Sequence, residues 1–445
     1  PCSRHAWAGV RGHARRATQI RNFSDHMLHT ERPRLELTLT LAAMAVFVLF
    51  AVGTVGGTNS SDLLALWLAG DALTAGGPVY PPDTTVFTMT PPPEWIERAR
   101  ALGHEGDVFP FLYPPLWAWI AGQIGQVVPW GGFVAGANLV NAILLAGTVL
   151  VASRLGAPAI RQDLFVAVSL VFLSLTTVGH VALVENQPQI LVSFLILFTL
   201  ERSERGAAVT AGLALALAAS IKLYPALFAI IWLATGQRRA VLAFAIGGAA
   251  LAGLSILLAG WPLHREFLHL VGLISKTAVL SNYVYSADAL VAYLFYVDAA
   301  REVPSADGGF WLIVAKPAAA RLVSAAGLVL VLALAVLSLR RLVGAGDRAL
   351  VWGATLIGVG LFGPLSWSYH YIAPVAMLPM IWSRLGARQG VAVLFALGLA
   401  LYYSETPLLS WLSGHGVHHF QIATFAIALL LALYIGLIRR AGRPA

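Results

Sequence analysis

Long apolar runs, separated by short polar or basic connectors, recur along almost the whole chain. The clear runs cover residues 37–55, 133–152, 163–179, 187–200, 240–259, 318–339, 349–363, 372–383, 390–403 and 418–438. A helix needs about 20 apolar residues to cross a membrane. Some of these runs are shorter, which suits helices surrounded by other helices. The pattern predicts an all-α protein that crosses a membrane many times.

Two other apolar segments do not fit a single crossing. Residues 113–128 form a short run that starts with two prolines, and residues 207–234 are too long for one span. Cytoplasmic connectors carry an excess of Lys and Arg. If the basic connectors all face the cytoplasm, 113–128 must lie along the outer surface or re-enter. If the connectors on both sides of 207–234 face the cytoplasm, this segment must begin and end on the same side of the membrane. It must therefore form two short helices that meet near Lys222 on the outer side.

The chain is therefore predicted to be a bundle of about twelve transmembrane helices with both termini in the cytoplasm. Residues 1–36 form a basic tail, 37–438 the membrane domain and 439–445 a second tail, with outer loops at 56–132 and 260–317. Residues 1–34 hold seven Arg and two acids. A cytoplasmic tail explains these arginines better than nucleic-acid binding does. The first outer loop supports this orientation, because residues 56–112 hold seven acidic and two basic residues.

Composition excludes several classes of protein. The chain is 58% hydrophobic and only 11% charged, whereas about a quarter of the residues of a soluble domain are charged. A soluble enzyme, a disordered regulator and a nucleic-acid-binding domain are therefore excluded as the main function. The single Cys2 excludes a disulfide framework and a cysteine-based metal site. No nucleotide-binding or zinc-protease motif is present, and we expect no cofactor.

The polar and aromatic clusters all fall on the predicted outer side, whereas the inner connectors are short and basic. Charged groups at membrane depth are costly and usually functional. We therefore expect the functional site on the outer face, in the segments 59–67, 79–83, 111–117, 179–189, 220–225, 281–294 and 364–374.

Asp62 lies just after the first predicted span, beside Ser60 and Ser61. Its carboxylate could act as a general base on a sugar hydroxyl. Asp is also a favoured helix N-cap, and both roles are compatible.

Lys222 is one of only three lysines, and apolar sequence surrounds it on both sides. A Lys at a helix break near the outer surface suits a phosphate group. The alternative is an interfacial Lys that extends toward water.

His370 is flanked by Trp367, Tyr369 and Tyr371. These aromatic rings suit either a sugar platform or an interfacial aromatic belt. The imidazole could bind a phosphate or a hydroxyl group, or it could be structural.

The remaining polar residues give weaker signals. Glu185, Asn186 and Gln187 could bind sugar hydroxyls or cap the following helix, and Asn282 offers similar polar contacts. A cluster of three histidines at 415, 418 and 419 has no nearby carboxylate or Cys, so we expect no metal there.

The order of these motifs resembles a known family. Asp62 is followed by G-x-x-x-Y-P, F-x-Y-P-P-L, N-Q-x-Q, S-I-K-x-x-P, S-N-x-x-x-S-A and S-W-x-x-H, at residues 76–81, 111–116, 186–189, 220–225, 281–287 and 366–370. The pattern resembles glycosyltransferase family 87 over about residues 37–438. Its better-known members are polyprenol-phosphate-mannose-dependent mannosyltransferases of mycobacterial glycolipid assembly.

The resemblance implies a GT-C fold, in which short helices in a large first outer loop lie parallel to the membrane. It also implies a polyprenyl-phosphate sugar donor and no metal. Asp62 would be the catalytic residue, and Lys222 and His370 would bind the donor phosphate. Two departures occur, because Tyr369-His370 replaces a His-His pair and the segment at 281–286 is degenerate. Candidate contacts to sugar or acceptor are Tyr80, Tyr113, Asn186, Gln187, Asn282, Trp367 and Tyr369.

We therefore expect a plasma-membrane hexosyltransferase or pentosyltransferase with its active site on the outer face. It would move a mannose-like sugar from a polyprenyl-phosphate carrier to a lipid or glycan acceptor, with inversion. The alternative is a multi-span transporter or a flippase for lipid-linked sugars. Convergence of Asp62, Lys222 and His370 on one outward cavity would favour the transferase, and a polar path across the whole bundle would favour transport.

Overall fold

A computed structural model describes residues 33–56, 60–82, 84–156, 160–304, 310–402 and 406–442. The most N-terminal helix in these ranges is Pro33–Val55. The helices that follow it are α2 (Ser61–Ala75), α3 (Glu94–Ala101), α4 (Pro115–Gly125), α5 (Trp130–Arg154), α6 (Gln162–Leu175), α7 (Thr177–Val184), α8 (Gln189–Glu204), α9 (Ala208–Ile221), η1 (Tyr224–Ala226), α10 (Leu227–Ala234), α11 (Arg238–Ala259) and α12 (Trp261–Ser275). The C-terminal half contains β1 (Thr277–Leu280), α13 (Ala287–Tyr296), η2 (Val297–Ala299), β2 (Arg301–Pro304), β3 (Phe310–Ala315), α14 (Ala318–Arg341), α15 (Ala345–Phe362), η3 (Ser368–Tyr371), α16 (Ile372–Ala376), α17 (Pro379–Leu385), α18 (Ala387–Ala400), α19 (Pro407–Ser413) and α20 (His419–Ala441).

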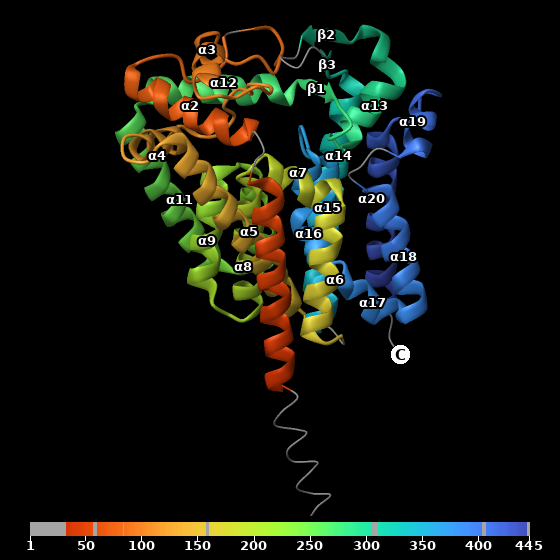
Figure 1. Ribbon diagram of the computed structural model, residues 1–445. Coiled ribbons are helices and arrows are strands. Elements are labelled where there is room, and N and C mark those ends of the chain that lie inside the picture. The colour runs from red at the N-terminus through yellow and green to blue at the C-terminus, as the bar shows by residue number, and fades with distance from the viewer. Residues whose placement is uncertain are drawn as a thin grey trace, which may run out of the picture.

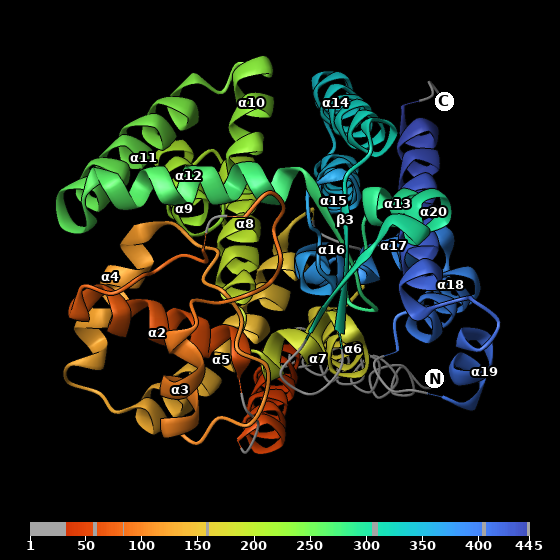
Figure 2. The same cartoon turned by 90° about the horizontal axis from the view of Figure 1, so that it is seen from above.

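The helices form an upright bundle with a layer of shorter elements across one end (Figure 1). This end layer contains α2, α3 and α12, so the two predicted outer loops meet there although they are far apart in sequence. Figure 2 shows α12 lying across the ends of the helices beneath it. The chain is thus a helical membrane protein, and the described ranges contain five helices long and apolar enough to cross a membrane: Pro33–Val55, α5, α11, α14 and α20. The total of twelve spans and the tail boundaries remain predictions, and residues 1–32 and 443–445 lie outside the described ranges.

The predicted break near Lys222 is present. Helix α9 ends at Ile221, Lys222 has an extended backbone, and η1 follows before α10. Pro225 lies in η1, and its ring removes a backbone donor. The indole of Trp117 on α4 donates to the Ser220 carbonyl at 2.6 Å, which satisfies one of the free carbonyls at the end of α9.

Two predicted spans are interrupted. Segment 163–179 divides into α6 and α7 at Thr176, which has extended dihedral angles and forms an isolated β-bridge with Tyr402. Segment 372–383 divides into the short helices α16 and α17, and Pro379 is the first residue of α17. Hydropathy did not detect either break, because both segments remain apolar throughout.

Helix α4, in the ambiguous segment 113–128, packs closely against α2. It has 11 residues and is therefore about 16 Å long, which is too short for a hydrocarbon core of about 30 Å. The two helices touch through glycines, since a Cβ added at Gly70 would lie 2.4 Å from the backbone nitrogen of Gly122. Only glycine permits this approach.

A small sheet in the second outer loop was not predicted. It is antiparallel with the order β1-β3-β2. Two of its strands have only four residues and no clear alternation, so hydropathy could not separate them from the surrounding apolar sequence. A buried ion pair between Lys316, just after β3, and Asp288 on α13 attaches the sheet to its neighbour.

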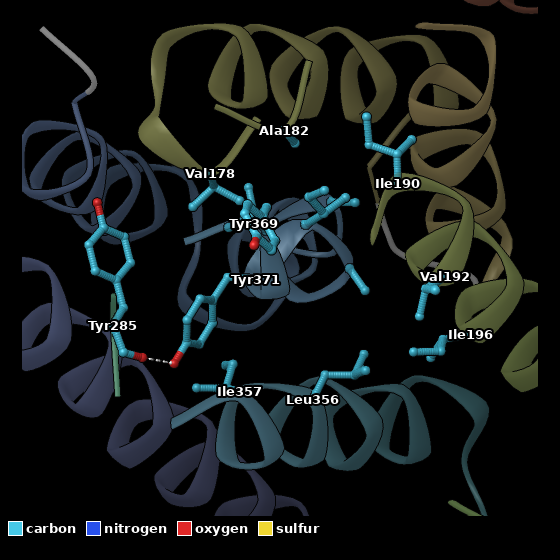
Figure 3. Close-up of a cluster of buried hydrophobic side chains, with 14 of the residues drawn as sticks. Val178, Ala182, Ile190, Val192, Ile196, Tyr285, Leu356, Ile357, Tyr369 and Tyr371 are labelled. Carbon is cyan, nitrogen blue, oxygen red and sulfur yellow. Dashed lines mark hydrogen bonds between the residues drawn. The ribbon is translucent and has the colours of Figure 1, made fainter. Parts of the chain in front are cut away.

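The core beneath the end layer is shown in Figure 3. Side chains from α7, α8 and α15 surround Tyr369 and Tyr371, and the Tyr371 hydroxyl donates to the Tyr285 carbonyl at 2.5 Å. Backbone pairing extends this link, because Ser368 donates to the Tyr283 carbonyl at 2.7 Å. The second outer loop is thereby fixed to the segment that carries His370.

We expect Gly70→Ala to lower the melting temperature of the detergent-solubilised protein. Overpacking of a tight contact costs about 1–3 kcal/mol, which exceeds the gain in helix propensity of about 1 kcal/mol from replacing Gly by Ala. The control is Gly136→Ala on α5, where an added Cβ meets nothing within 4 Å. Equal melting temperatures for the two variants would contradict the close α2–α4 packing.

Candidate active site

A cavity of about 860 Å³ lies between the end layer and the helix bundle. Its walls come from α2, α7, α12, β3, α15 and the loops near residues 106–114, 221–224, 280–283 and 363–370. Asp62, Lys222 and His370 all line it. The three residues singled out in the sequence therefore share one cavity, although each comes from a different part of the chain.

The N-terminus of α2 is capped by a distant carboxylate. The Ser61 and Asp62 backbone N–H groups donate to Glu185 Oε2 at 2.9 and 3.2 Å. Ser60, at the N-cap position, makes no side-chain cap, and its hydroxyl donates to the Val184 carbonyl at 2.8 Å. Glu185 therefore caps the helix that carries Asp62, and not the following helix as the sequence had suggested.

The Asp62 side chain is oriented by an amide. Gln187 Nε2 donates to Asp62 Oδ2, and Gln187 Oε1 accepts from the Tyr113 hydroxyl at 3.1 Å. The Tyr113 carbonyl in turn accepts from the Tyr80 hydroxyl at 2.8 Å. Gln187 is fully buried, so this chain of hydrogen bonds holds the Asp62 carboxylate from the side away from the cavity.

Asn186 stabilises the turn that also carries Glu185 and Gln187. Its φ of 49° lies in the left-handed region, which Asn tolerates better than most residues. Its amide nitrogen donates to Ser60 Oγ at 2.8 Å and Asn138 Oδ1 at 2.6 Å, and its amide oxygen accepts from Asn141 at 3.0 Å. A buried polar network of this kind holds a single geometry.

Lys222 reaches the cavity between two aromatic rings. Its Nζ lies 4.8 Å from the ring centre of Tyr369 and 5.7 Å from that of Tyr113. Such cation–π contacts partly replace the lost hydration of an ammonium. Among the described residues no carboxylate forms an ion pair with Lys222, which leaves its N–H groups available to an anion.

His370 has a defined tautomer. Its Nδ1 lies 3.2 Å from the Trp367 carbonyl, and a carbonyl only accepts, so Nδ1 carries a proton. In the neutral imidazole, Nε2 is therefore an acceptor. The ring also meets Tyr224 edge-on, with 5.7 Å between ring centres.

Two of the carboxylates that line the cavity, Asp62 and Glu185, have different proton affinities. Burial raises the pKa of Asp62 to about 6, while the hydrogen bond from Gln187 and the charge of Lys222 oppose the rise. Burial, and then the charge of Asp62, raises the pKa of Glu185 further. When two carboxyl groups differ in pKa in this way, one usually acts as the acid and the other as the base. Asp62 is the carboxylate that is ionised near neutral pH.

The pKa values of Lys222 and His370, two of the nitrogen bases that line the cavity, shift in the opposite direction. Burial lowers the pKa of Lys222 to about 7, and the charge of Asp62 opposes this. Burial, and then the charge of Lys222, lowers the pKa of His370 well below its usual value of 6.5. His370 is therefore neutral at pH 7, and Lys222 is the main cation of the cavity.

The other candidate contacts divide into two groups. Tyr113, Asn282, Trp367 and Tyr369 line the cavity. Asn186 and Gln187 are buried behind it, and Tyr80 lines a different cavity. The polar groups of these three residues are directed to protein partners, and their contact with sugar or acceptor stays a prediction.

The sequence motifs did not single out His180 and Trp311, which line the cavity, and they indicated His418 only as part of a histidine cluster. Trp311 belongs to the sheet that was not predicted. Gln189 was missed as a support, although its amide donates to the Tyr224 hydroxyl at 2.7 Å. The polar stretch at 185–189, between two apolar segments, was the sequence signal for this support. The sequence analysis interpreted that stretch mainly as a helix cap. Within the described ranges, no group of three or more His, Cys, Asp or Glu side chains could hold a metal ion.

Comparison with known proteins identifies the family. The family model for glycosyltransferase family 87 matches residues 111–365, more than half of the chain. The chain belongs to glycosyltransferase family 87. No curated protein matches the sequence.

The family match covers only part of the candidate site. The matched part contains Lys222, Tyr113 and Asn282, whereas Asp62 lies 49 residues before it and His370 five residues after it. The assignment of Asp62 and His370 to the glycosyltransferase site therefore depends on the cavity that they share with Lys222, and not on the family match.

We expect Glu185→Ala to destabilise the protein by about 1–2 kcal/mol, because two backbone donors at the start of α2 lose their cap. Glu185→Gln retains an acceptor oxygen and should lose less. The measurement is thermal unfolding, together with hydrogen exchange at Ser61 and Asp62. Equal losses for the two variants would show that the cap does not stabilise α2.

Proposed function

We propose that this membrane glycosyltransferase moves a sugar from a polyprenyl-phosphate carrier to a lipid or glycan hydroxyl at the outer membrane surface. The observation that carries the proposal is the shared cavity of Asp62, Lys222 and His370. It combines a carboxylate poised as a base with an ammonium that has no ion-pair partner among the described side chains. A sugar transfer from a phosphate carrier needs this pair of functions.

The chemistry is a single displacement at the anomeric carbon. The acceptor oxygen forms a bond to that carbon while the bond from the carbon to the phosphate oxygen breaks. Asp62 takes the proton of the acceptor hydroxyl, and a base with a pKa near the working pH is efficient. Attack from the face opposite the phosphate inverts the anomeric centre.

The leaving group departs as a phosphate anion, so it needs no general acid. Lys222 stabilises its charge, as positioned cations do in phosphoryl and glycosyl transfer. His370 can donate to the phosphate through Nε2 only when it is protonated, since Nδ1 is already bonded. The negative charge of a bound phosphate favours that protonation.

The apolar part of the cavity suits a lipid carrier. Ile221, Leu223, Leu356 and Val359 line it beside Lys222. Leu223 is 49% exposed, so this wall continues to the surface of the bundle. A polyprenyl chain could lie there while its phosphate reaches Lys222.

The charges at the two ends of the bundle support the proposed orientation. The C-terminal end of α20, with Arg439 and Arg440, lies at the end opposite α2, α3 and α12 (Figure 1). The positive-inside rule places that end in the cytoplasm, and hence the cavity on the outer face of the plasma membrane.

Transport is the weaker alternative. The cavity lies toward one end of the bundle, and the other end is closed by ion pairs such as Arg348 with Glu204 at 2.7 Å and Arg384 with Asp347 at 2.8 Å. A continuous polar path across the bundle would favour transport, and the cavity residues give no support for one.

Asp62→Asn should abolish transfer while donor binding and expression persist, because the amide cannot accept the proton. Activity is measured with purified protein and a panel of polyprenyl-phosphate sugars, with products detected by mass spectrometry. The matched control is Asp71→Asn on the same helix, whose carboxylate pairs with Arg98 at the surface. Transfer by Asp62→Asn near the wild-type rate would exclude Asp62 as the base.

We expect kcat/KM to fall below about pH 6, as Asp62 takes up a proton, and above about pH 7, as Lys222 loses one. Lys222→Arg keeps its charge at high pH, so its alkaline limb should move up by more than about one pH unit. If the alkaline limb does not move, a group other than Lys222 causes it.

Lys222→Ala should weaken donor binding more than acceptor binding. Lys276→Ala at an exposed site is the control. Equal weakening of both substrates would indicate a structural role for Lys222.

A further inference from the structure

The corner of the active-site cavity around Lys222 and His370 offers few donors to a phosphate. Lys222 supplies an ammonium. The Nε2 of neutral His370 only accepts, because Nδ1 holds the proton that faces the Trp367 carbonyl. Phosphate oxygens accept several hydrogen bonds, and bonds to an ionised group are stronger than bonds between neutral groups. A second donor in this corner would therefore strengthen the binding of a phosphate.

Tyr224 lies in this corner. It belongs to η1, two residues after Lys222, and it lines the same cavity. Its ring meets the His370 ring edge-on, with 5.7 Å between ring centres. The His370 ring lies 5.2 Å from that of Tyr369, and the Lys222 Nζ lies 4.8 Å from the Tyr369 ring centre. The four side chains are thus neighbours around one corner of the cavity.

The hydroxyl oxygen of Tyr224 accepts a hydrogen bond from the protein interior. Gln189 on α8 is fully buried, and its Nε2 donates to this oxygen at 2.7 Å and to Ser193 Oγ at 3.1 Å. A tyrosine hydroxyl can donate its own proton in addition to the bond that it accepts. The described part of the chain provides no acceptor for that proton, which is therefore available to a ligand in the cavity.

Tyr224 and His370 differ as donors to a phosphate. His370 can donate through Nε2 only after it gains a proton. A tyrosine hydroxyl is neutral and protonated at physiological pH. It therefore adds a donor beside Lys222 without adding a second positive charge to a buried site.

We propose that the Tyr224 hydroxyl donates a hydrogen bond to the phosphate of the polyprenyl-phosphate carrier, beside Lys222. Tyr224 is then a catalytic residue, because this bond strengthens as negative charge develops on the departing phosphate. Its proton stays on its own oxygen throughout the transfer. Gln189 is a positioning residue, because its bond to the Tyr224 oxygen directs the proton toward the cavity. This inference rests on the proposed function.

The test measures binding of farnesyl phosphate and of uncharged farnesol to the full-length protein by isothermal titration calorimetry. Tyr224→Phe keeps the ring and its contact with His370. It should weaken farnesyl phosphate binding about tenfold or more, the effect of a lost hydrogen bond to a charged group, and leave farnesol binding unchanged. The control is Tyr434→Phe on α20, which should bind both molecules as the wild type does. Tyr434 is buried outside the cavity, and its hydroxyl has no partner within the described ranges.

Gln189→Met tests the positioning role. It should weaken farnesyl phosphate binding in the wild-type background, and it should have little further effect in the Tyr224→Phe background, because the two side chains act as a unit. A role in stability alone would give the same loss in both backgrounds and would weaken farnesol binding as well.

Equal affinity of the wild type and Tyr224→Phe for farnesyl phosphate would overturn the inference and leave the proposed function standing. The Tyr224 proton would then belong to Gln189 Oε1, a buried atom that has no other partner within the described ranges. Equal weakening of farnesyl phosphate and farnesol would also overturn it, since the loss would not concern the phosphate. If the wild-type protein binds farnesyl phosphate no more tightly than farnesol, the proposed phosphate site fails, and the role of Tyr224 fails with it.

Discussion

Burial of ionisable groups in one cavity is the constraint on which this structure depends. Asp62, Glu185 and Lys222 all lose hydration, and an uncompensated buried charge is strongly destabilising. Each group has a specific compensation. Two backbone donors of α2 face Glu185, the Gln187 amide faces Asp62, and two tyrosine rings face Lys222. Burial, opposed by some of these contacts, brings the pKa values of Asp62 and Lys222 to about 6 and about 7, where the two groups can exchange protons or bind an anion.

These compensations come from segments that are distant in sequence, and this explains the architecture of the end layer. The turn at 185–189 positions α2, the break after α9 exposes Lys222, and pairing of 283–285 with 366–368 positions His370. The end layer closes over them and leaves a polar chamber beside an apolar wall. The proposed polyprenyl-phosphate donor would need this boundary, because its phosphate requires charge and its chain requires lipid.

Much of the fold followed from hydropathy and charge. The break at Lys222 was predictable because Ser-Ile-Lys-Leu-Tyr-Pro interrupts an apolar segment that is too long for one span. The sheet β1-β3-β2 was not predictable, because its strands are short and resemble their apolar surroundings. The break at Thr176 was missed for a related reason, since apolar sequence continues through it and the β-bridge with Tyr402 forms only in the tertiary structure. The break before Pro379 has a local signal, because proline favours the first turn of a helix, but hydropathy does not register it.

The sequence by itself determined that the chain is a helical membrane protein, and its motifs indicated which carboxylate, ammonium and imidazole to examine. The membrane character of a helix follows directly from its sequence, because every residue contributes its own free energy of transfer from water to lipid. Only the tertiary structure decided what each polar residue contacts. Asn186 and Gln187 could equally have faced a sugar or the protein, and the long-range packing of α2 against the turn at 185–189 directed them inward. Such contacts depend on three-dimensional positions that local sequence does not specify.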